Sequence, residues 1–66
     1  MNQLYECLLV TEGYRLKISV YSDGVFSAER MARQRAVRLL KENYGIRRNE
    51  EAFKIVDVQE KSQPIR

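Results

Sequence analysis

The alternation of apolar and polar positions near the start of the chain predicts two β-strands. Residues 4–10 form a short apolar run, and residues 14–21 alternate with the two-residue period of a half-buried strand. The gap at 11–13 ends in a glycine, which suits a hairpin loop. A β-hairpin is therefore expected over residues 4–21. The apolar positions of its second strand are Tyr14, Leu16, Ile18 and Val20.

The hydrophobic period then changes to that of an α-helix. Residues 28–44 contain no glycine or proline and are mostly strong helix formers. Ser27 suits the N-cap, Glu29 would lie in the first turn, and Gly45 suits the left-handed position that ends a helix. Phe26, just before this cap, would pack back onto the helix as a hydrophobic staple. The stripe expected to face a sheet consists of Ala28, Ala32, Ala36, Leu39 and Leu40.

A third strand is predicted at 52–58 by its β-branched and aromatic residues. Its period of two places Phe53 and Ile55 on one face, and Val56 and Val58 on the other. The side of the sheet that each set chooses stays open from the sequence. The polar segment that follows contains the only proline of the chain and is expected to fray.

The order strand, strand, helix, strand predicts the fold class. We expect one small α+β domain of ββαβ order over residues 1–60, with a flexible C-terminal tail at 61–66. A right-handed crossover through the helix lets the third strand pair with the first. The result is a three-stranded antiparallel sheet of order 2-1-3, with one helix packed on one of its faces.

This order makes the first strand central, and a central strand carries apolar residues on both faces. Since Glu6 alternates with Tyr5, Cys7 and Leu9, these three are expected to face the helix. The opposite face of the sheet would remain uncovered unless the connector or the tail folds over it. Uncovered apolar residues usually mark an interaction surface. The self-association face predicted in this way consists of Leu4, Leu8 and Val10.

The length of the chain adds a reason to expect association. A domain of 66 residues has a small core, and such domains usually gain stability from disulfides, a metal or a second subunit. Cys7 is the only cysteine and there is no histidine, so neither a disulfide within the chain nor a zinc site is expected, and no cofactor is predicted. The lone thiol and the absence of a long apolar run predict a cytoplasmic protein without a membrane segment.

The net charge of +3 is distributed unevenly along the chain. Residues 30–48 contain seven bases and one acid, whereas the segments on either side are mildly acidic. Three interpretations of this basic segment stay open: contact with nucleic-acid phosphates, docking of an acidic protein, or a solvated helix face whose arginines pair with Glu29, Glu42 or acids of a neighbouring element. The predicted basic binding face consists of Arg30, Arg33, Arg38, Lys41, Arg47 and Arg48.

The sequence offers little catalytic chemistry, and we expect no enzyme. No histidine is available to activate a serine or Cys7, and a thiol among apolar strand residues is ordinarily inert. Glu50 and Glu51 lie in a connector expected to be solvated. The three glycines are scattered and form no phosphate-binding loop.

The leading functional expectation is therefore a small regulator, adaptor or inhibitor that binds a protein partner stoichiometrically and forms a homodimer. The alternative is a nucleic-acid-binding protein that contacts phosphates through the basic helix at 28–44 together with Arg47 and Arg48. The layout of residues 4–59 resembles that of many small accessory proteins of bacteria and their phages. This likeness is one of architecture and carries over no functional residue.

Overall fold

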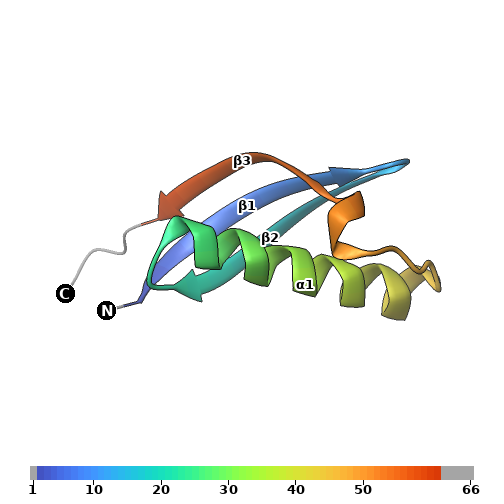
Figure 1. Ribbon diagram of the computed structural model, residues 1–66, viewed down its shortest axis with the longest axis horizontal. Helices are drawn as coiled ribbons and strands as arrows, with labels where there is room; N and C mark the ends of the chain where they lie inside the picture. Colours follow the sequence, from blue (N-terminus) through green and yellow to red (C-terminus); the bar gives the residue numbers. More distant parts are fainter. Residues whose placement is uncertain (1, 62–66) are drawn as a thin grey trace.

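The computed structural model describes residues 2–61 and confirms the predicted fold (Figure 1). The elements are β1 (Gln3–Thr11), β2 (Tyr14–Ser22), α1 (Val25–Tyr44), the short 3₁₀-helix η1 (Glu50–Ala52) and β3 (Lys54–Lys61). The three strands are antiparallel in the order β2-β1-β3, and α1 lies along one face of the sheet. Of the expected tail at 61–66, Lys61 ends β3 and the remainder lies outside the described residues.

The β1–β2 hairpin is longer and tighter than its sequence pattern indicates. Thr11 pairs with Tyr14, so the loop contains only Glu12 and Gly13. Gly13 has a φ of 83°, a left-handed conformation that glycine adopts without strain. The register from this turn places Leu9 opposite Leu16, and all the apolar positions of β2 then fall on the face of the sheet that α1 covers.

The start of α1 differs from the prediction. Gly24, not Ser27, is the N-cap, and the helix begins at Val25, so Glu29 lies beyond the first turn. The Ser22 hydroxyl fixes this start locally. It donates to the Gly24 carbonyl at 3.0 Å and accepts from the Gly24 N–H at 3.3 Å, while the same carbonyl accepts the first helical hydrogen bond, from Ala28, at 3.0 Å.

This earlier start also changes the position of Phe26. The residue lies within the first turn of α1 and 88% of its surface is exposed. The predicted hydrophobic staple is therefore wrong. The other end of the helix is as predicted, because Gly45 has a φ of 69° and its N–H donates to the Lys41 carbonyl at 3.0 Å.

The core lies between α1 and the sheet. Three alanines of α1 are fully buried, and their small side chains allow the helix to approach the strands closely. Leu39, which was predicted to share this stripe, is only partly buried. The buried apolar residues are Tyr5, Cys7, Leu9, Ile18, Val20, Ala28, Ala32, Ala36, Leu40 and Phe53.

A β-bulge in β3 corrects the predicted faces of the third strand. Leu8 pairs with Asp57 and Leu9 with Ile55, so Val56 is an extra residue without a partner on β1. Beyond the bulge the alternation is reversed, and Val58 joins Ile55 against the core instead of facing away from it. The bulge also keeps the Asp57 carboxylate on the open face, where it stays hydrated.

The second face of the sheet has no element packed on it among residues 2–61. Leu4, Leu8 and Val10 lie on this face, as predicted, and each is partly buried. Their neighbours across the strands are mainly long polar or charged side chains. The flanking residues are Arg15, Lys17, Ser19 and Tyr21 on β2, and Lys54, Asp57, Gln59 and Lys61 on β3.

Candidate nucleic-acid interface

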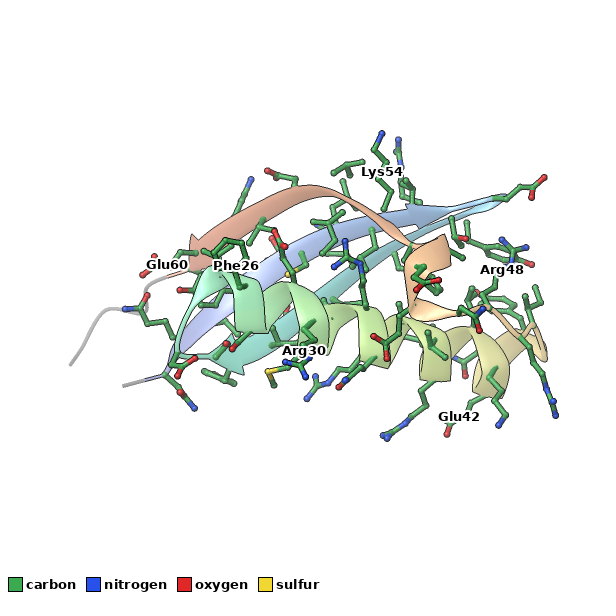
Figure 2. The ribbon with its side chains drawn as sticks, viewed as in Figure 1. Phe26, Arg30, Glu42, Arg48, Lys54 and Glu60 are labelled. Carbon is green, nitrogen blue, oxygen red and sulfur yellow. The ribbon has the colours of Figure 1, made fainter. Side chains whose placement is uncertain are left out.

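The outer face of α1 carries a row of bases that we call the basic ridge: Arg30, Arg38 and Lys41. At about 100° per residue, these three lie within about 80° of one another around the helix, and Gln34 lies between them. All four side chains are exposed. Figure 2 shows Arg30 pointing away from the sheet. The ridge therefore projects into solvent from a helix whose opposite side is fixed in the core.

The charges of this ridge are not neutralised within the described part of the chain. The one ion pair among residues 2–61 joins the Lys61 ammonium to the Glu6 carboxylate at 3.6 Å, and it lies on the sheet. Glu29 and Glu42, the acids of α1, form no ion pair with the ridge within that range. The arrangement thus differs from the solvated face with internal pairs, which was one of the three interpretations of the basic segment.

The other predicted basic residues lie in different surroundings. Arg33 is partly buried on the flank of α1 that faces β3, and its Nε donates to the Phe53 carbonyl at 3.3 Å. Arg47 is exposed in the connector that follows α1. The structure thus brings together only Arg30, Arg38 and Lys41 on one surface of the helix.

Arg48 holds the connector against the tip of the hairpin (Figure 2). Its Nη1 donates to the Thr11 hydroxyl at 3.0 Å and to the Glu12 carbonyl at 3.2 Å. Its guanidinium carbon also lies 6.0 Å from the centre of the Tyr14 ring, at the outer limit of a cation–π contact. The Tyr14 ring in turn packs against Tyr44 at the end of α1, with 5.4 Å between ring centres. We infer that Arg48 mainly stabilises the fold.

Two residues of this surface were not predicted as site residues. Arg35 lies on the flank of α1 that faces β2, opposite to Arg33, and its Nη1 donates to the Ser19 carbonyl of β2 at 3.0 Å. Together with Met31, Gln34 and Arg38 it lines a shallow depression beside the ridge. Phe26 lies one turn before Arg30. Its position follows from the start of the helix, which the Ser22 hydroxyl fixes and the sequence pattern did not reveal.

Cys7 is fully buried in the core. Burial raises the pKa of its thiol above the ordinary value, and the negative charge of Glu29 acts in the same direction. The thiol is therefore protonated at neutral pH, and a protonated, buried thiol is a poor nucleophile. Among residues 2–61, no three acidic or thiol side chains come together in a group that would hold a metal ion.

Length alone would allow α1 to span a bilayer, but its composition does not. No helix of residues 2–61 is apolar enough over a sufficient length to cross a membrane.

Comparison with models of known protein families, with curated proteins and with solved structures found no match.

Proposed function

We propose that this chain is a non-enzymatic nucleic-acid-binding protein and that the basic ridge of α1 contacts the phosphate backbone. The observation that carries the proposal is the row of three exposed bases on a helix face, with no carboxylate of residues 2–61 paired to them. Phosphates supply the missing negative charge, and each contact releases counterions from the nucleic acid. Arg30 and Arg38 can each form two parallel hydrogen bonds with one phosphate.

The composition of the ridge favours binding that does not depend on sequence. Arginine and lysine contact phosphates as well as base edges, and phosphate contacts carry no sequence information. Reading of adenine edges requires asparagine or glutamine side chains on an inserted element. Here Gln34 is the one amide side chain between the bases, and the ridge has the composition of a phosphate-contacting surface. We therefore expect similar affinities for unrelated sequences of the same length and strandedness.

The salt dependence of binding tests this function. Fluorescence anisotropy with labelled single strands and duplexes, at about 50 and 200 mM salt, measures the affinity at each condition. Three or four phosphate contacts to a single strand predict an affinity loss of about 20- to 50-fold over that range. If the true ligand is an acidic protein, or if the ridge is only solvated, neither nucleic acid should bind at the lower salt. That result would contradict the proposal.

A second candidate function, stoichiometric binding of a protein partner as a homodimeric regulator, adaptor or inhibitor, is favoured by the open face of the sheet. Leu4, Leu8 and Val10 form an apolar row along the central strand that Glu6 interrupts between Leu4 and Leu8, and no element of residues 2–61 covers them. A second copy of the chain would bury this row and add the stability that small domains commonly gain from association. A lone buried thiol suits the reducing cytoplasm, where we place the protein.

Leu8→Arg tests the homodimer because it places a charge in the middle of the apolar row. We expect wild type to sediment as a dimer at high micromolar concentration, and Leu8→Arg to sediment as a monomer or to unfold. Lys17→Ala is a matched control, since Lys17 lies directly opposite Leu8 on the same face but adds no apolar area to the row. A wild-type chain that remains monomeric at high concentration would rule out self-association.

A further inference from the structure

Phe26 is the most exposed of the large apolar side chains in the described part of the chain. Its exposed fraction is 88%, compared with 59% for Tyr44, which packs against Tyr14. No aromatic contact is formed by Phe26 within residues 2–61. It lies in the first turn of α1, at the same end of the molecule as Glu60 (Figure 2). The fold thus holds an aromatic ring in solvent on a rigid helix.

The position of this ring relative to the basic ridge indicates what it contacts. Phe26 and Arg30 are one turn apart and differ by about 40° around the helix, so their side chains are neighbours on its surface. Farther along the helix, Lys41 lies about 60° and Arg38 about 120° from Phe26 around the axis. Since each residue advances the helix by 1.5 Å, Phe26 and Lys41 are about 22 Å apart along the axis. The outer half of α1 therefore offers a stacking ring at one end and cations along its length.

We propose that the ligand of this surface is single-stranded nucleic acid, with one unpaired base stacked on the Phe26 ring and the adjoining phosphates on the basic ridge. Single strands expose the flat faces of their bases, and aromatic side chains beside a basic surface stack on them with little regard to sequence. A duplex offers the same phosphates, but its base faces are occupied by neighbouring base pairs. The inference rests on the proposed function and adds the strandedness of the ligand and the role of Phe26.

The Phe26→Ala variant separates stacking from charge. The substitution removes an exposed side chain and improves helix propensity, so we expect the thermal unfolding midpoint to be unchanged or slightly raised. Wild type should bind a single strand of about 15 nucleotides more tightly than the matching duplex. Loss of one stacked base should weaken single-strand binding by about 5- to 140-fold and leave duplex binding within about twofold. Anisotropy at low salt measures both.

Two controls make the result specific to the ring beside the ridge. Tyr21→Ala removes another exposed aromatic residue, 58% exposed on the open face of the sheet, and should leave both affinities unchanged. Phe26→Leu keeps an apolar side chain but removes the π-face, and should behave like Phe26→Ala. A strand that contains 2-aminopurine gives a second readout, because stacking on Phe26 should quench its fluorescence with wild type and not with Phe26→Ala.

The outcomes distinguish the two proposals. If wild type binds both ligands with a steep salt dependence but Phe26→Ala binds the single strand as tightly as wild type, the role of Phe26 is overturned and the proposed function stands. If wild type binds neither ligand at low salt, the proposed function fails as well, and Phe26 is more simply explained as a contact for a protein. Equal loss of single-strand and duplex binding in Phe26→Ala would also contradict base stacking.

Discussion

Replacing Leu9 by alanine is expected to leave most molecules unfolded at 25 °C. Leu9 is fully buried in the central strand, between Leu16 on β2 and Ile55 on β3. Leucine-to-alanine changes at such sites cost about 2.7–5.0 kcal/mol. Domains of this size commonly have a total stability of only about 3–5 kcal/mol. Urea unfolding followed by circular dichroism should show little or no native baseline for the variant.

Leu8→Ala is the matched control, because it makes the same change in the adjacent residue, on the opposite face of the same strand. Leu8 is partly exposed with no element over it, and we expect a cost of about 1 kcal/mol or less in the isolated chain. A small effect of Leu9→Ala would contradict the described core. A cost for Leu8→Ala as large as that for Leu9→Ala would mean that a second copy covers the open face.

The strands and the helix could be predicted because each depends on a short-range pattern, and the sheet order follows from their sequence through the right-handed crossover. The alternation in residues 14–21 and the glycine at position 13 together determine the hairpin, and its register places Tyr14, Leu16, Ile18 and Val20 on the face that α1 covers. The helix-period stripe with alanines at 28, 32 and 36 identifies the buried side of α1. These signals agree with one another, so the coarse fold follows from them.

The start of α1 could not be predicted because a local side-chain contact overrode propensity. Val25 and Phe26 are weak helix formers, and Ser27 is a good cap residue, so the pattern favours a helix that begins at residue 28. The Ser22 hydroxyl instead holds Gly24 as the N-cap, and the helix includes both weak formers. The exposed position of Phe26 is a direct consequence.

The bulge at Val56 could not be predicted from the sequence for a different reason. Strict alternation would place Asp57 on the same face as Ile55, against the core, and expose Val58. One extra residue avoids burial of the carboxylate and recovers Val58 for the core. Leaving Val56 unpaired costs little beside burying a carboxylate, but the alternation of apolar and polar residues carries no information about either cost.

The path of the connector decides which basic residues stay exposed and which contact the backbone. No local sequence pattern specifies this path. Arg33 and Arg48 are bases like the ridge residues and lie in the same basic segment, residues 30–48. Because the connector passes beside the hairpin tip and η1 leads into β3, these two arginines meet backbone carbonyls that are free to accept. The predicted basic face therefore combined three bases that are exposed on α1 with arginines that contact the backbone of other elements.

Reversing two charges of the ridge, with Arg38→Glu and Lys41→Glu together, is expected to abolish detectable nucleic-acid binding. The variant loses two phosphate contacts and places two carboxylates where the backbone would lie. For a single strand, two lost contacts alone reduce the salt slope by about 1.4, which corresponds to a loss of about 60-fold at 50 mM salt. Repulsion adds to this loss. Anisotropy at about 20, 50 and 200 mM salt measures the affinity and the slope.

The stability of the same variant shows whether the loss is one of contact or of folding. Both side chains are exposed, and only Lys41, in the last turn, gains from the helix dipole, so we expect a thermal stability lower by about 1 kcal/mol or less. Arg15→Glu with Lys17→Glu is the matched control. It changes the net charge by the same amount on the open face of the sheet. If the ridge binds the nucleic acid, the affinity should fall much further for the helix variant than for the sheet variant. Equal losses would mean that overall charge, and not the ridge, governs binding, whereas full binding by the helix variant would remove α1 from the interface.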